Sequence, residues 1–96
     1  MQQGRLEEAE ALLTRAIRIW EEELDARHPA VARALSQLAL IQLEQGHLEE
    51  AEALQRRSIA ILEHAMGAQH PDVATAQGNL ALIHEAQRKG ADANPL

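Results

Sequence analysis

Apolar residues recur every three or four positions through most of the chain. In the first such stretch they are Leu6, Ala9, Leu13, Ala16, Ile17, Trp20 and Leu24. This spacing gathers them on one stripe of an α-helix and predicts a helix over residues 6–24. The same spacing predicts helices over residues 30–45, 48–66 and 72–88. Residues 91–96 carry no such stripe, and we expect them to form a disordered tail.

An internal duplication runs through these helices. When the chain is shifted by 42 positions, residues 4–45 are identical to their counterparts at 23 of 42 positions. A period of this length is typical of a solenoid, in which helical units bury their apolar faces against one another. The link at Gly46 and His47 is too short for anything except an antiparallel return. We therefore predict an all-α fold of stacked antiparallel helix pairs, in the order long, short, long, short, in one domain over residues 1–90.

The breaks between the helices follow one pattern in both copies. Pro29 and Pro71 lack a backbone N–H, which is tolerated at the first position of a helix, so each is expected to mark a helix start. Gly67 suits the left-handed residue that ends a helix. Asp25 is its counterpart in the first copy and is expected to adopt the same conformation at some strain.

Composition excludes several classes of function but adds little to the prediction of the fold. The formal charge is -6 and no run of basic residues exceeds two, so nucleic acid, which requires clustered Lys and Arg, is not an expected partner. No apolar run approaches the ~18 residues of a membrane span, and the first residues lack the apolar segment of a secretory signal. The chain has no cysteine, which is compatible with the cytoplasm, and we expect a cytoplasmic protein. Trp20, the only aromatic residue, lies on the first stripe and is expected to pack against the next helix rather than act as an exposed binding anchor.

The histidines do not form a metal site in the sequence. The chain has five, and no two are three or four positions apart on one predicted helix, the spacing that would point both rings at one ion. His84-Glu85 opens like a zinc-protease motif, but Arg88 stands where the second histidine is needed. No nucleophile motif is present either. We expect no metal, no cofactor and no enzymatic activity.

Several segments together resemble a tetratricopeptide repeat. They are Leu38-Ala39-Leu40-Ile41, Gln45-Gly46, Leu48-Glu49-Glu50-Ala51-Glu52-Ala53-Leu54 and His70-Pro71-Asp72-Val73-Ala74. The nearest form is the repeat of about 42 residues found in kinesin-light-chain-like proteins, against ~34 in the standard repeat. The resemblance covers residues 4–87 and implies a short right-handed α-solenoid, with the short helices as A helices, the long ones as B helices, and the order B-A-B-A. Gln42 and His84 depart from the family pattern, since an aromatic residue is common there.

The resemblance also implies a binding surface. In such repeats the A helices line a concave groove that holds a peptide or protein segment. By position, the groove would be lined by Arg33, Ser36, Gln37, Leu40, Glu44, Thr75, Gly78, Asn79 and Leu82. Asn79 matches the asparagine that bonds a partner's backbone in many members, whereas Gln37 departs from it. The leading hypothesis is a non-catalytic protein-binding scaffold.

Two other hypotheses follow from the order of the helices. The chain begins with a B helix and ends with an A helix, so each end lacks the neighbour that another copy could supply. This order favours self-assembly, either head to tail with the fourth helix of one copy beside the first helix of the next or as a swapped oligomer. It also favours a fragment of a larger multidomain protein.

Overall fold

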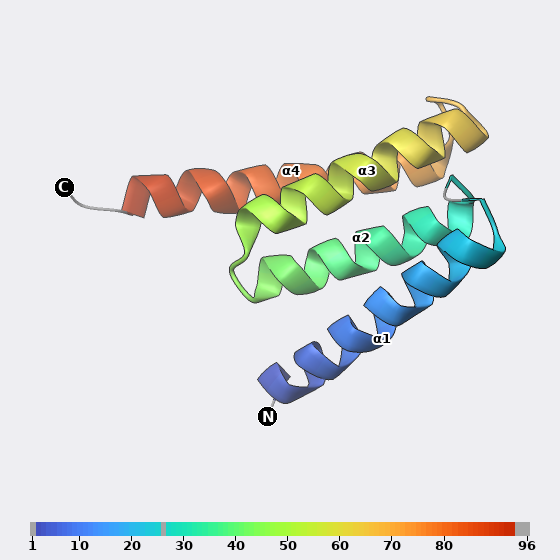
Figure 1. The fold of residues 1–96 in the computed structure, drawn as a ribbon. Helices are drawn as coiled ribbons and strands as arrows, with labels where there is room; N and C mark the ends of the chain where they lie inside the picture. Colours follow the sequence, from blue (N-terminus) through green and yellow to red (C-terminus); the bar gives the residue numbers. More distant parts are fainter. Residues whose placement is uncertain (1, 26, 94–96) are drawn as a thin grey trace.

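The computed structural model describes residues 2–25 and 27–93 and consists of four helices. These are α1 (Gln2–Glu23), α2 (Pro29–Glu44), α3 (Leu48–Met66) and α4 (Pro71–Ala93) (Figure 1). Each helix packs against the next one in the chain, and α2 also touches α4. No strand occurs in the described parts of the chain. The prediction of an all-α fold built from stacked helices is confirmed.

Two helix ends differ from the prediction. The helix α1 begins at Gln2, four residues before the first apolar residue of its stripe, and α4 continues to Ala93 instead of ending at 88. The counterpart of Gly46, which follows α2, is Arg88, so α4 lacks the residue that stops α2. Gly90 has no positive φ and does not replace it. The predicted domain limit at residue 90 therefore falls inside α4, which is the longest helix rather than a short one, and residues 94–96 of the predicted tail lie outside the described residues.

The starts of α2 and α4 share one capping arrangement. Each helix begins with the predicted proline, preceded by a histidine. The Nδ1 atom of His28 accepts a hydrogen bond from the backbone N–H of Ala30 at 3.1 Å. The Nδ1 atom of His70 accepts one from the backbone N–H of Asp72 at 3.0 Å. The imidazole thus satisfies a backbone donor that has no partner within the first turn of the helix.

Glycine residues follow α2 and α3, as predicted for Gly67, whereas Asp25 after α1 differs from its prediction. Gly46 and Gly67 have φ angles of 85° and 88°, in the region that favours glycine. Asp25 does not adopt this conformation, since no described non-glycine residue has a positive φ. Its Oδ1 atom accepts a hydrogen bond from the backbone N–H of Arg27 at 2.9 Å. The prediction for Asp25 was wrong because an Asp side chain can close the turn itself and needs no left-handed backbone.

The main core lies on both sides of α2. It contains Ile17, Val31, Ala32, Ala34, Leu35, Leu38, Ile61, Leu62, Val73 and Ala76. Half of these residues belong to α2, which is covered by α1, α3 and α4. Trp20 is half-buried and packs against this core, as predicted from its place on the first stripe. Within the described residues, no helix combines the length and the apolar character that crossing a membrane requires.

Candidate partner-binding groove

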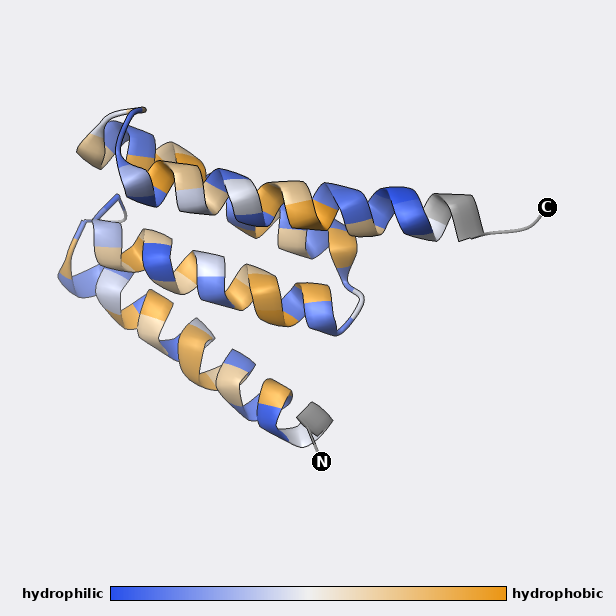
Figure 2. Ribbon diagram, turned by 180° about the vertical axis from the view of Figure 1, so that it is seen from behind, coloured by the Kyte–Doolittle hydropathy of each residue, from blue (hydrophilic) through white to orange (hydrophobic). Residues whose placement is uncertain are grey.

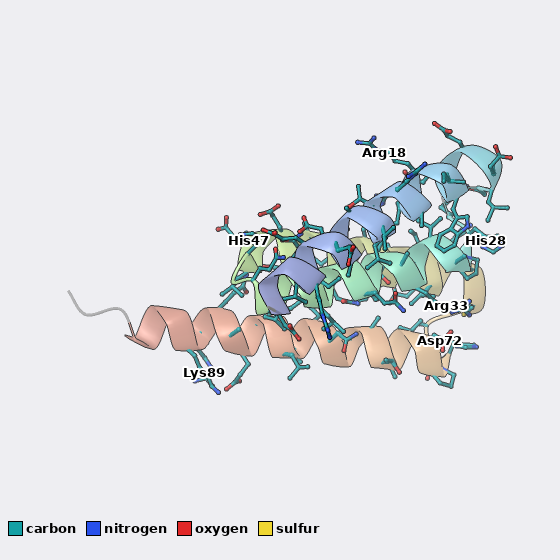
Figure 3. The ribbon with its side chains drawn as sticks, turned by 90° about the horizontal axis from the view of Figure 1, so that it is seen from below. Arg18, His28, Arg33, His47, Asp72 and Lys89 are labelled. Carbon is teal, nitrogen blue, oxygen red and sulfur yellow. The ribbon has the colours of Figure 1, made fainter. Side chains whose placement is uncertain are left out.

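The helices α2 and α4 lie in contact, and Arg33 and Asp72, which are 39 positions apart in the sequence, join them. Figure 3 shows these two side chains meeting near the first turns of the two helices. The Nη2 atom of Arg33 lies 3.3 Å from the Oδ2 atom of Asp72. Both side chains are exposed, and such pairs contribute less than about 1 kcal/mol, so this contact orients the two helices more than it stabilises them.

Most of the predicted groove residues lie on the solvent side of these two helices. Arg33, Gln37, Glu44, Thr75 and Leu82 are exposed, and Leu40 and Asn79 are half-buried. These residues form what we call the groove face. Leu82 keeps 57 % of its surface exposed, whereas most described leucines are buried or half-buried. The groove face therefore combines apolar and polar side chains that their own fold does not cover.

Ser36 and Gly78 lie elsewhere. The Ser36 hydroxyl is 2.8 Å from the Ser58 hydroxyl, and its oxygen accepts a hydrogen bond of 2.8 Å from Nε2 of Gln55. Ser36 is thus directed at α3 and not at the groove. Gly78 is its counterpart, on the corresponding side of α4, where an added Cβ would meet no described atom within 4 Å.

A shallow hollow extends the groove face toward α1. It has a volume of about 170 Å³ and is lined by Leu13, Trp20, Ala30, Arg33, Ala34 and Gln37. Two of these residues, Arg33 and Gln37, belong to the groove face. Leu13 and Trp20 both lie on the first apolar stripe, but a stripe indicates packing and does not show which edge of the helix stays open.

A second ion pair lies on α1 and α3. A nitrogen of Arg57 on α3 contacts a carboxylate oxygen of Glu21 on α1. This pair joins α3 to α1, as the Arg33–Asp72 pair joins α2 to α4. Neither Arg57 nor Glu21 belongs to the groove face. The Arg57–Glu21 pair is therefore a natural reference for effects that come only from breaking an exposed contact between helices.

An electrostatic cluster around Glu52 also lies outside the groove face, on α3 and α4. Hydrogen bonds from Gln87, Arg56 and His84, in that order, lower the pKa of Glu52 from 4.5 to about 2, although partial burial opposes the shift. The Oε1 atom of Glu52 accepts from Nε2 of Gln87 at 2.9 Å, and its Oε2 atom accepts from Nε of Arg56 at 2.9 Å. No group of three or more potential metal ligands gathers among the described residues.

The two family positions at which an aromatic is common are used for polar contacts. Nε2 of Gln42 donates to Oε2 of Glu10 at 2.9 Å, and Nε2 of His84 lies 3.4 Å from Oε2 of Glu52. Glu10 and Glu52 are counterparts, as are Gln42 and His84. Both copies therefore join a B helix to the following A helix by the same polar contact in place of aromatic packing.

Comparison with known proteins agrees with this architecture. The family model of the tetratricopeptide repeat matches residues 1–64, which is more than half of the chain and includes α1, α2 and most of α3. Among curated proteins, none matches the chain significantly. The duplicated helix pairs, their stacking and this match lead to one assignment. The chain belongs to the tetratricopeptide repeat family.

Proposed function

We propose that the protein is a non-catalytic scaffold that binds a peptide or protein segment on the groove face. Repeats of this family generally mediate protein–protein interactions. The observation that supports this face is that its two side-chain amides have no hydrogen-bond partner among the described residues. These amides belong to Asn79 on α4 and Gln37 on α2.

An amide group suits the backbone of a bound segment. It offers two N–H donors and one carbonyl acceptor, which match the C=O and N–H groups of an extended chain. Leu82, with 57 % of its surface exposed, and the half-buried Leu40 offer apolar contact to the side chains of the same segment. Backbone recognition combined with apolar contact is a common mode of peptide binding.

Charge contributes little to this recognition. Arg33 is already paired with Asp72 at 3.3 Å, and Glu44 is the only other charged residue of the groove face. We therefore expect affinity to depend weakly on salt, because exposed charges at this density are largely screened at physiological ionic strength.

A peptide-display selection on the intact chain tests the proposal. Peptides selected on the wild type should bind the variant Arg33→Ala/Asn79→Ala at least about tenfold more weakly, which corresponds to the loss of roughly one or two hydrogen bonds. The matched control is Arg57→Ala/Gln77→Ala, which also removes one exposed ion pair between helices and one exposed amide, both outside the groove face.

The comparison between the two variants decides the outcome. If peptides bind both double variants as well as the wild type, the groove face is not the binding surface. If both variants lose binding equally, the loss reflects the fold rather than the groove face, and the proposal is also wrong.

Two narrower statements belong to the same proposal. The repeats are of the kinesin-light-chain-like type, which the 42-residue unit favours over the standard ~34 residues. The scaffold acts in the cytoplasm, which the acidic, cysteine-free composition favours. An experimental structure superposed on repeats of each type tests the first statement, and imaging of the tagged chain in its source cells tests the second.

A further inference from the structure

The duplication indicates that the uncovered side of α1 is suited to packing against another helix, because its counterpart side of α3 packs on α2. The helix α3 packs on α2 through small and apolar residues. Those of α3 are Ala51, Leu54, Ser58 and Ile61. The Ser58 hydroxyl, for example, donates to the carbonyl oxygen of Ala32 at 2.7 Å. The counterparts of these residues in α1 are Ala9, Leu12, Ala16 and Ile19, which we call the α1 open face.

The α1 open face keeps its apolar character although none of the described helices covers it. Leu12 and Ile19 are 63 % and 48 % exposed, whereas the counterpart of Ile19, Ile61, is 5 % exposed. Figure 2 shows the apolar bands along α1. Exposed neighbouring apolar side chains of this kind mark a contact surface more often than an ordinary surface.

The uncovered side of α4 is more polar than the corresponding side of α2. The side of α2 that faces α3 carries Leu43, which packs in the second core cluster. In α4 this position is Glu85, which is exposed. Residues 84–90 of α4 are mainly hydrophilic (Figure 2). A second copy docked head to tail would bring the Glu85 carboxylate toward the apolar side chains of α1, which is unfavourable without a new polar partner.

The α1 open face is instead complementary to itself. We propose that two copies of the chain form a two-fold symmetric dimer in which their α1 helices pack antiparallel through this face. In this register Leu12 lies opposite Ala16 of the second copy, and Ile19 lies opposite Ala9 of the second copy. Each large side chain meets a small one, the pairing that lets two helices approach closely.

The charged residues at the two ends of the face agree with the same register. Arg5 lies one turn before Ala9, and Glu23 lies one turn after Ile19, both exposed on the same side of α1. In the antiparallel dimer Arg5 lies opposite Glu23 of the second copy, and the pair occurs twice. A parallel arrangement would place each charge beside its own like charge, which disfavours that register.

The rest of the molecule leaves room for this contact. The helix α1 packs against α2 through Leu13, Ile17 and Trp20, which lie on a different side from Leu12 and Ile19. The dimer therefore covers neither α2 nor the groove face. An isologous contact of this kind also closes on itself and does not form a filament.

Sedimentation equilibrium of the full chain tests the dimer. Because the contact involves one helix per copy, we expect a dissociation constant between about 10 µM and 1 mM, in the range of small transient interfaces. Leu12→Glu/Ile19→Glu should raise this constant at least about thirtyfold. The control Leu82→Glu places a charge on an equally exposed leucine of α4 and should leave the constant unchanged.

Charge reversal tests the orientation. Arg5→Glu should weaken the dimer about fivefold, because two glutamates then face each other at both ends. Adding Glu23→Arg to the same chain should restore the wild-type constant. A parallel contact would show no such rescue, and its absence would overturn the proposed register.

The lack of native cysteine permits a direct test of distance. A mixture of Leu12→Cys and Ala16→Cys chains should form a heterodimer disulfide under mild oxidation, whereas Leu12→Cys alone should form little. Efficient cross-linking of Leu12→Cys to itself would show a parallel contact and contradict the proposal. A chain that stays monomeric to 1 mM, or that dimerises equally well with both glutamates in place, would contradict it as well.

Discussion

At the scale of single residues, the contact between α2 and α3 contains polar groups that an apolar stripe does not announce. Gln55 and Ser58 are fully buried, and they form a chain of hydrogen bonds with Ser36 of α2. The counterparts of Gln55 and Ser58 are Leu13 and Ala16. Gln55 and Ser58 therefore replace apolar residues of the first copy, and their hydrogen bonds fix the register of α2 against α3.

We predict that Ser58→Ala lowers the free energy of unfolding by about 1 to 2 kcal/mol, because the Ala32 carbonyl and the Ser36 hydroxyl each lose a partner. Ser36→Ala should cost a similar amount, and the double variant less than the sum, with a coupling of about 0.5 to 1 kcal/mol. Urea denaturation measures all three. Additive losses would show that the two hydroxyls do not act together.

A second residue-scale prediction concerns acid. The pKa of Glu52 is about 2 in the folded chain, against its ordinary value of 4.5. Its contribution to stability is therefore complete above pH 4.5 and is lost as the pH falls toward 2, because the unfolded chain takes up the proton first. The carboxyl carbon of Glu52 should titrate near pH 2 by NMR, and Glu52→Gln should flatten the fall of the melting temperature between pH 4.5 and 2. A midpoint near 4 would contradict this prediction.

The sequence predicted the burial of individual residues better than it predicted the contacts between residues on different helices. Spacing placed Ile17 on the first apolar stripe, since spacing depends only on the helix itself, and Ile17 is buried. Spacing did not show that Gln42 would reach Glu10 or that His84 would reach Glu52, because those contacts depend on how two helices cross. The duplication held a usable signal, since both members of each pair are counterparts.

At the scale of the helices, the ends depend on single residues with a defined backbone conformation. Gly46 ends α2 with a φ of 85°, and the backbone N–H of His47 donates to the carbonyl oxygen of Gln42 at 2.8 Å beside it. In α4 this stop is absent, since Arg88 stands at the counterpart position. The apolar stripe ends in the same place in both helices, which is why spacing alone placed the end of α4 five residues too early.

Two glycine substitutions should therefore act in opposite directions. Gly46→Ala should destabilise the fold by about 1 kcal/mol, because alanine resists a positive φ although nothing obstructs its Cβ. Gly78→Ala should stabilise it by about 0.5 to 1 kcal/mol, because Gly78 lies inside α4 with free space around it. Thermal unfolding of the two variants measures both signs. A loss of stability in both would contradict the role of backbone conformation.

At the scale of the whole molecule, the sequence predicted the stacking and most of the exposed side of α2 and α4. The sequence analysis placed Ser36 in the groove because the family position was transferred without knowledge of how α2 is rotated about its own axis. The structure turns Ser36 toward α3, since its hydroxyl has two polar partners there. The hollow beside Trp20 was not predictable, because its volume depends on the crossing of α1 and α2.

The pattern of contacts between helices also has a consequence for how the chain folds. Each helix packs mainly on its neighbour in sequence, and α2 with α3 shares the most extensive contact. Contacts that are local in sequence favour rapid folding, and repeat domains of this kind open from their ends. Hydrogen exchange should therefore find the slowest amides in the middle of α2 and α3, with α1 and the far end of α4 exchanging first. The hairpin of α2 and α3 would then be the part that persists longest when the molecule unfolds, and the groove face would lose its α4 half while its α2 half is still folded.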